Sequence, residues 1–260
     1  MTGTIVGLDE ANHDTIGVAF GAYWMGSPAI GCGPANSLAT FQWALDPDGD
    51  PTTTGDMPDG INNSWGFTTG NTASFCNGAW VSALNAAEAV GIAVVFSAGN
   101  EGAQGPSSIT APKVINTDLV NSFCVGNVNG NVPSFPLAGS SSQGPTTCGG
   151  TGSWLIKPEV SAPGTGVRSA VPGNGYASFT GTSMAAPHVS AFRATRFFRH
   201  RFPLRMRACW PRPGFGTLAT VPPPPRKTRY MSMPTPACMR LAYALRAHRA
   251  VRTLSSKRSP

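Results

Sequence analysis

The clearest hydrophobic pattern is a helix-like segment followed by an apolar run. Residues 79–90 place Trp80, Leu84 and Ala87 on one face at helical spacing, and their alanine content favours a helix. Residues 92–97, IAVVFS, form a continuous apolar run rich in β-branched residues, which is typical of a strand buried on both faces. A helix leading directly into such a strand predicts an α/β fold with a mostly parallel sheet.

Other short segments extend this pattern along the chain. Stretches rich in Pro, Gly, Asp and Ser predict loops at residues 46–60 and 129–153. Short apolar segments predict further strands at residues 21–26, 59–64, 114–116 with 122–126, and 167–170.

Charge divides the chain into two unlike segments. Residues 1–190 hold all 12 acidic residues and three basic ones, Lys113, Lys157 and Arg168, for a formal charge of −9. Residues 191–260 hold 16 basic residues and no acidic one, so the net charge of +7 is an average of two opposite values. We therefore predict a domain at residues 1–190 and a separate basic tail at residues 191–260.

The tail of residues 191–260 lacks the composition of a folded domain. Arginine stands beside most of its aromatic residues, residues 222–225 are four prolines, and only residues 237–250 have a pattern compatible with a helix. A segment of this composition is predicted to be disordered in isolation. No apolar run in the chain reaches the length of a membrane span, and the first residues lack the pattern of a signal peptide.

The cysteines limit the chemistry further. None of the six forms a CxxC pair, which argues against a zinc site. Cys32, Cys76, Cys124 and Cys148 lie in the acidic segment and could form two disulfides in three pairings, or none in a reducing compartment.

A candidate nucleophile stands in TGTSMAAPH, residues 180–188. Ser183 lies between small residues that allow close approach, at the start of a predicted helix whose free N–H groups favour a developing negative charge. A serine hydroxyl becomes an effective nucleophile only when a base takes its proton. The alternative interpretation is a turn with an ordinary helix cap.

Two more candidate segments follow predicted strands. FSAGNEG, residues 96–102, contains Asn100, whose side-chain amide could stabilise an oxyanion. NNSWG, residues 62–66, offers a backbone on which a peptide could add as a strand. The alternatives are an ordinary turn asparagine and a plain strand end.

Together, these motifs resemble those of the subtilisin-like serine proteases, the subtilases. NNSWG, FSAGNEG, KPEVSAPGTGV and GTSMAAPHVS occur in the order and approximate spacing of that family, and SSSQGPT and TIGVAFGAYW resemble further family segments, with Phe20 where proline is usual. The resemblance covers about residues 1–190. It implies a three-layer α/β fold with a mostly parallel central sheet, and peptide-bond hydrolysis through an acyl-enzyme.

The resemblance also implies roles for individual residues. Ser183 matches the nucleophile and Asn100 the oxyanion-binding amide, with the Ser183 backbone N–H as second donor. The main specificity pocket matches Ser64, Trp65, Gly66, Ala98 and Gly99. A bulky residue at the Trp65 position would favour apolar or aromatic substrate side chains. The implied chemistry requires no cofactor, and its partners are peptide or protein substrates.

Two motifs of the family are absent. Its catalytic aspartate lies in D[ST]G and its catalytic histidine in HGTHVAG, both ahead of the other motifs, and neither occurs here. The opening MTGTIVG resembles the end of the histidine motif, so we expect the chain to begin just past it. The sheet is then expected to be incomplete at the N-terminus, with two unpaired inner edges, and Ser183 to be unactivated.

No other histidine fits the role of the base. His188 follows the serine by five residues, a spacing that does not share a helix face. His13 and Asp14 lie in ANHDTIGV, which resembles a calcium-binding loop of some subtilases and makes Asp14 a calcium candidate, with a plain surface loop as the alternative. His200 and His248 lie in the tail without a motif.

Three functions compete on the sequence alone. The first is a subtilase-type serine endopeptidase, secreted as family members usually are, with this chain inactive for want of the aspartate and histidine. The second is a catalytically dead peptide-binding module. The third is non-specific binding of polyanions by the basic tail, because no motif for specific nucleic-acid recognition is present.

The change in composition after Ser190 yields a prediction about the gene. Four arginines, Arg193, Arg196, Arg199 and Arg201, replace the apolar continuation that a buried helix needs. We expect the reading frame to shift just after codon 190. One of the other two frames of the genomic DNA should then encode an apolar helix-like continuation. If neither frame encodes one, the frame shift is contradicted.

Overall fold

The structure is a computed structural model that describes residues 1–27, 37–67, 73–116, 122–201 and 242–246. Its centre is a six-stranded sheet of order β1-β8-β2-β3-β4-β5, and β6 and β7 form a separate two-stranded sheet. The strands are β1 (Tyr23–Ser27), β2 (Gly60–Asn63), β3 (Ala93–Ser97), β4 (Phe123–Val128), β5 (Val160–Pro163), β6 (Val167–Val171), β7 (Gly175–Phe179) and β8 (Ala242–Arg246). The helices are α1 (Thr2–Val6), α2 (Ser37–Leu45), α3 (Ala73–Cys76), α4 (Ala79–Ala89) and α5 (Thr182–Arg201), with short 3-10 turns η1 (Gly102–Gln104) and η2 (Gly152–Leu155).

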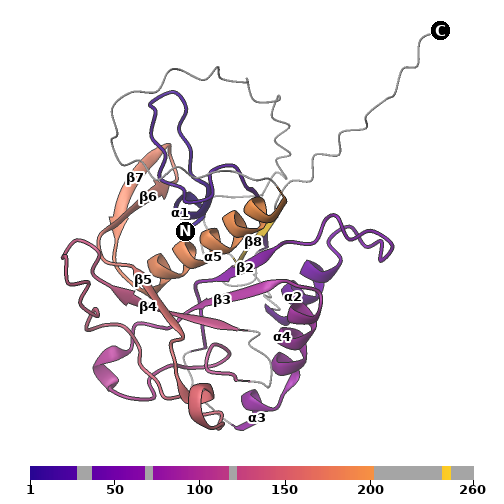
Figure 1. The fold of residues 1–260 in the computed structure, drawn as a ribbon, viewed down its shortest axis with the longest axis vertical. Helices are drawn as coiled ribbons and strands as arrows, with labels where there is room; N and C mark the ends of the chain where they lie inside the picture. The colour runs from indigo at the N-terminus through magenta and orange to yellow at the C-terminus, as the bar shows by residue number, and fades with distance from the viewer. Residues whose placement is uncertain (28–36, 68–72, 117–121, 202–241, 247–260) are drawn as a thin grey trace.

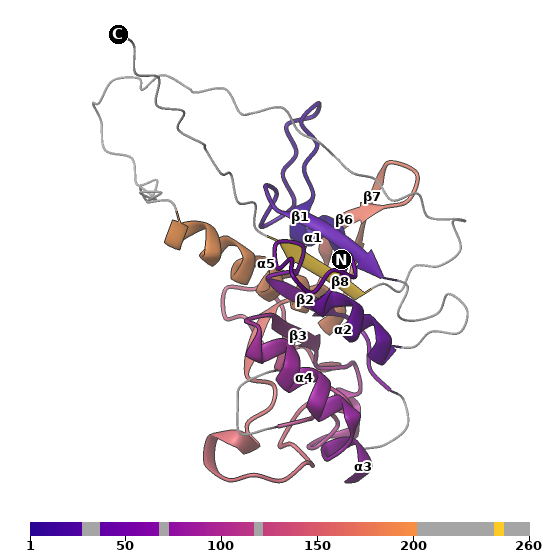
Figure 2. The same ribbon diagram turned by 90° about the vertical axis from the view of Figure 1, so that its right-hand side faces the viewer.

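Helices cover both faces of the central sheet. Strands β2, β3, β4 and β5 run parallel to one another. Helix α5 packs against all four of them, whereas α4 packs against β3 from the other side, with α2 beside it (Figures 1 and 2). The predicted α/β architecture with a mostly parallel sheet between helical layers is therefore confirmed.

Strand β3 shows why its sequence is apolar throughout. Val94 and Phe96 point into a cluster shared with α2 and α4, whereas Val95 points to the opposite face and packs with residues of α5. Because successive side chains of a strand face opposite sides, a strand covered by helices on both faces needs apolar residues at every position.

Most of the predicted elements are confirmed. The helix predicted at 79–90 is α4, with Trp80, Leu84 and Ala87 buried, and the apolar run is β3. The strands predicted at 21–26, 59–64, 122–126 and 167–170 correspond to β1, β2, β4 and β6.

The strand predicted at 114–116 is wrong. This segment is a turn in which the Val114 N–H donates to the carbonyl of Thr110 and the Ile115 N–H to that of Pro112. Val114 and Ile115 are buried all the same, so their apolar character reflects packing rather than strand pairing. Helices α1, α2 and α3, strands β5 and β7, and the two 3-10 turns were not among the predicted elements.

The basic tail differs from its prediction at one place. Residues Ala242–Arg246 form β8, which pairs antiparallel with both β1 and β2 and so lies between them. The expectation of a disordered tail does not hold for these five residues, and the expected pair of unpaired inner edges is occupied by a strand. The helix considered for 237–250 is a strand where the structure describes it.

Helix α5 continues past Ser190 to Arg201. Ala191 is buried against Ile5 of α1, whereas Phe192 is exposed. Figure 2 shows the C-terminal part of α5 extending away from the sheet, so this part of the helix does not cover the sheet. The domain boundary at residue 190 stays a prediction.

A disulfide joins helix α3 to the segment that precedes η2. Cys76 at the end of α3 pairs with Cys148 across 72 residues of sequence. Cys124 is a free, buried thiol. Cys32, and the cysteines of the tail, lie outside the described residues.

A buried ion pair from the KPEVSAPG motif joins two parallel strands. Lys157 Nζ pairs with Glu159 Oε1, and the Lys157 side chain is fully buried. The second carboxylate oxygen of Glu159 accepts the backbone N–H of Cys124 in β4 at 2.8 Å. Glu159 therefore neutralises a buried ammonium and anchors the neighbouring strand at once.

We predict that Glu159→Gln destabilises the fold by about 3 kcal/mol, because the buried Lys157 ammonium then has no counter-charge. Urea unfolding followed by circular dichroism measures the change. The paired replacement of Lys157 by Met and Glu159 by Leu is the control, since removing both charges costs far less than removing one. Equal unfolding midpoints for the wild-type chain and Glu159→Gln would contradict this account.

Candidate active site

Three segments far apart in sequence meet at one edge of the central sheet. Strand β2 ends at Asn63 and runs into Ser64–Gly66, strand β3 ends at Ser97 and runs into Ala98–Asn100, and helix α5 begins at Thr182. The carboxyl ends of parallel strands share one edge of a sheet, and the helix start reaches that edge. The structure thus brings together the predicted nucleophile, the predicted amide and the two predicted binding segments. We call Ser64–Gly66 and Ala98–Gly99 the binding segments.

The start of α5 is fastened to the first binding segment by a serine pair. Pro187 lies inside α5 and has no backbone N–H, so the Ser183 carbonyl four residues earlier lacks its helical hydrogen bond. The hydroxyl of Ser64 donates to this carbonyl at 3.1 Å. The proline of the APH motif therefore creates the acceptor that docks β2 onto the helix.

The second binding segment is fastened to the same helix by Thr182, which is fully buried. Its hydroxyl accepts the backbone N–H of Gly99 at 3.0 Å. Its own backbone N–H donates to Oδ1 of Asn100 at 2.9 Å, and its hydroxyl donates to the same oxygen at 3.2 Å. Because Oδ1 is held by two donors, the Asn100 amide has a fixed orientation, and Asn100 is an exposed residue.

Two buried asparagines at the end of β2 stabilise the first binding segment through hydrogen bonds. Asn62 donates to the Ser64 hydroxyl at 3.1 Å and accepts from the Ser190 hydroxyl at 3.0 Å, so it bridges β2 to α5. Asn63 accepts the indole N–H of Trp65 at 3.1 Å. Both asparagines are fully buried and both are satisfied, as buried amides must be.

Trp65 contributes to the core rather than to substrate contact through its side chain. The residue is 9% exposed, and its ring packs against Trp80 and Phe96, each at a centroid distance of 5.7 Å. The expectation that Trp65 favours apolar or aromatic substrate side chains therefore has no support in its placement. Its backbone still belongs to the binding segment.

The Ser183 hydroxyl has no base beside it in the part of the chain that the structure describes. It donates to the Ser64 carbonyl at 3.5 Å. His188 uses Nδ1–H on the Met184 carbonyl of its own helix at 3.0 Å, and burial lowers the pKa of its imidazole. His13 lies in the turn between Asp9 and Asp14.

Lys113 is a residue of this region that the motifs did not reveal. It is 4% exposed, and its Nζ lies close to the backbone of both binding segments, at Gly66 and at Gly99. The available signal was its rarity, since only three basic residues precede position 191. Burial lowers the pKa of the Lys113 ammonium, which the charge of Glu101 opposes.

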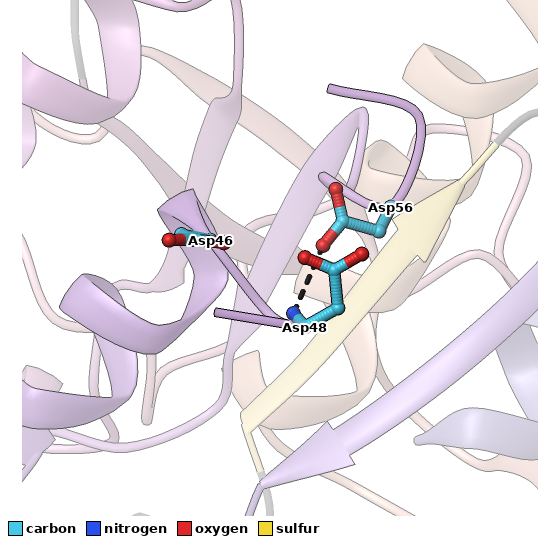
Figure 3. A group of neighbouring side chains, drawn as sticks. All are labelled: Asp46, Asp48 and Asp56. Carbon is cyan, nitrogen blue, oxygen red and sulfur yellow. Dashed lines mark hydrogen bonds between the residues drawn. The ribbon is translucent and has the colours of Figure 1, made fainter. Parts of the chain in front are cut away.

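Two places with acidic side chains, one of them a cluster, were considered as cation sites. Asp14, the calcium candidate, pairs through its carboxylate with Arg168 at 2.8 Å. Asp46, Asp48 and Asp56 form a cluster after α2, with ligand atoms within 4.8 Å of one another, and the Asp48 N–H donates to Asp56 (Figure 3). Calcium at Asp14 stays a prediction, and an added cation would compete there with Arg168.

A serine at a helix start, an amide of fixed orientation beside it and two backbone segments thus lie together at one edge of the sheet. The sequence model of the subtilase family matches residues 1–197, and the chain belongs to this family of serine endopeptidases. The predicted family membership and enzyme class are confirmed.

Individual relatives agree with this assignment. Bacillopeptidase F of Bacillus subtilis strain 168 is 38% identical over 205 residues, which are 75% of this chain and 13% of that protein. Subtilisin E of the same strain is 33% identical over 147 residues, 55% of this chain and 31% of that protein. The chain therefore spans less than a third of the length of either relative.

Solved structures similar to this chain include two proteases. The S41 psychrophilic protease has a TM-score of 0.48 at 28% identity and covers 66% of this chain and 52% of its own. Sphericase has a TM-score of 0.47 at 28% identity and covers 63% of this chain and 48% of its own. Among the described residues, no helix combines the length and apolar character needed to cross a membrane.

The Ser64–Ser183 hydrogen bond predicts an energetic coupling with Pro187. Ser64→Ala should destabilise the chain by about 1 kcal/mol, because a partly buried carbonyl loses its donor. In a Pro187→Ala background the helix supplies that donor, so Ser64→Ala should cost less by about 0.5–1 kcal/mol. Urea unfolding of the four variants of this double-mutant cycle measures the coupling, and an equal cost of Ser64→Ala in both backgrounds would contradict it.

Proposed function

We propose that this site performs the acyl-transfer chemistry of a serine endopeptidase on peptide or protein substrates. The observation that carries the proposal is the pair of hydrogen bonds from Thr182 to Asn100, at 2.9 and 3.2 Å. They hold the carboxamide so that its NH₂ group is available beside the start of α5, where Ser183 stands. An amide donor fixed in advance stabilises charge without reorganising during the reaction.

In this proposal each group has one step. The Ser183 oxygen attacks the substrate carbonyl, the carbonyl π electrons move onto oxygen, and a base takes the hydroxyl proton. The oxyanion is bound by the Asn100 amide and by the Ser183 backbone N–H. This N–H lies in the first turn of α5, where backbone donors have no acceptor within the helix. Collapse breaks the C–N bond, the amine leaves with a proton, and water then hydrolyses the acyl ester. No cofactor enters this sequence.

We propose that the chain of 260 residues, by itself, turns over peptides negligibly. The Ser183 hydroxyl is paired with a carbonyl rather than with a base, and a carbonyl cannot accept its proton for catalysis. A positioned general base contributes about 10²- to 10⁴-fold in rate. Peptide binding without turnover is the second candidate function of this chain, and the same observation favours it.

We propose a secreted protein, on the basis of the family and of one disulfide. Family resemblance favours a secreted protein, and the Cys76–Cys148 disulfide supports an oxidising compartment. The polyanion-binding alternative rests on a tail of which the structure describes only Ala242–Arg246 beyond α5.

The proposal is tested with a peptide that carries a chromogenic leaving group and a photoreactive side chain. We expect the peptide to crosslink to residues 64–66 and 98–100, mapped by mass spectrometry, because these backbone segments flank the nucleophile. Turnover should equal that of the Ser183→Ala chain.

Two outcomes would contradict parts of this account. Crosslinks confined to other segments would show that the site does not bind peptides. Turnover that Ser183→Ala abolishes would show that the chain is active, which would refute the predicted inactivity and support the endopeptidase chemistry.

A further inference from the structure

A buried cation lies between the two binding segments. A Cβ atom placed on Gly66 would stand 2.7 Å from Lys113 Nζ, and one placed on Gly99 would stand 2.8 Å from the same nitrogen. Glycine is thus required at both positions for the lysine to lie there, and at Gly99 it is also required by a φ of +110°. The lysine head group and the two glycines form one arrangement, which we call the lysine–glycine site.

Lys113 has little compensation for its burial. Lys113 lies in a buried, largely apolar stretch of the chain, and the residue itself is only 4% exposed. Cys124 lies near it, but burial raises the pKa of that thiol to about 12, so the thiol is neutral and supplies no counter-charge at neutral pH. The acidic neighbour is Glu101.

Glu101 also lies beside Gly99, where a Cβ atom would contact its Oε2 as well as Lys113 Nζ, and this carboxylate is hydrogen-bonded. Its carboxylate accepts the Ser142 hydroxyl at 2.8 Å, and the same hydroxyl accepts the Glu101 backbone N–H at 3.0 Å. These two hydrogen bonds tie the Glu101 carboxylate to Ser142, whose hydroxyl also lies close to Gly99. A buried ammonium with a single, otherwise engaged carboxylate nearby favours a second anion at the site.

We propose that Lys113 makes the site selective for peptides that carry Asp or Glu immediately before the bond to be cleaved. The proposal rests on the proposed function, because it takes Ser64–Gly66 and Ala98–Gly99 as the segments that flank this substrate side chain. An acidic side chain entering between them meets the Lys113 ammonium, whereas its amide analogue leaves that charge uncompensated. Lys113 is thus a specificity-determining residue rather than a catalytic one.

The test measures binding rather than turnover, so that it does not depend on the missing base. Five peptides of the form acetyl-Ala-Ala-Pro-X-Ala-amide, with X as Glu, Gln, Asp, Asn or Phe, are titrated into the full chain at low ionic strength. Affinities follow from competition with one fluorescent reference peptide. We expect Glu and Asp peptides to bind about tenfold more tightly than their matched amides, a difference of about 1.4 kcal/mol.

Two variants separate the charge of Lys113 from its volume. Lys113→Met keeps the length of the side chain and removes the charge, so the Glu-to-Gln affinity ratio should fall to about one. Glu101→Gln removes the competing carboxylate and should raise that ratio above its wild-type value. The wild-type comparison of Glu with Gln stands without either variant, so poor folding of a variant leaves the test intact.

The outcomes distinguish this inference from the proposed function. Binding of the Gln or Phe peptide as tightly as the Glu peptide would overturn the acidic preference and leave peptide binding at the site standing. A preference for Glu that Lys113→Met leaves unchanged would overturn the role of Lys113. Failure of all five peptides and of the reference peptide to bind would overturn the proposed function, and this inference with it.

Discussion

The site depends on a hydrogen bond that a proline makes necessary. Pro187 cannot donate to the Ser183 carbonyl, so this carbonyl at the start of α5 needs a donor from outside the helix, and the Ser64 hydroxyl supplies it at 3.1 Å. Thr182 fastens the other binding segment within one residue of the same point. One turn of helix therefore sets the position of both strand ends, and the proposed nucleophile, Ser183, is positioned by the contacts that join the helix to the sheet.

Sequence reasoning found what local patterns encode. The apolar run of β3 and the one-sided face of α4 were predictable because burial acts on neighbouring positions. Ser183 and Asn100 were proposed from short, specific motifs, and the structure places Asn100 against the residue next to Ser183. Val114 and Ile115 misled the prediction, since apolar residues in a buried turn look like those of a strand. Lys113 escaped notice because nothing next to it in sequence shows that two glycines, 47 and 14 positions away, surround its head group.

The strand β8 shows a second limit of local patterns. Its segment looked like part of a weak helix in a charged tail, yet it occupies the place between β1 and β2 where the resemblance to the family predicted unpaired edges. Backbone N–H and C=O groups are the same for every residue, so an edge accepts any segment that can extend beside it. Pairing of this kind depends on the availability of an edge more than on the composition of the strand that fills it.

Trp65 has a consequence for how such a site can diversify. The residue belongs by its backbone to a binding segment and by its ring to the aromatic core around Trp80 and Phe96. Selection for recognition and selection for packing therefore act on the same position, and a change there must satisfy both. The Lys113 head group lies instead beside two glycines, so a substitution there changes the charge between the binding segments without replacing an aromatic ring of the core.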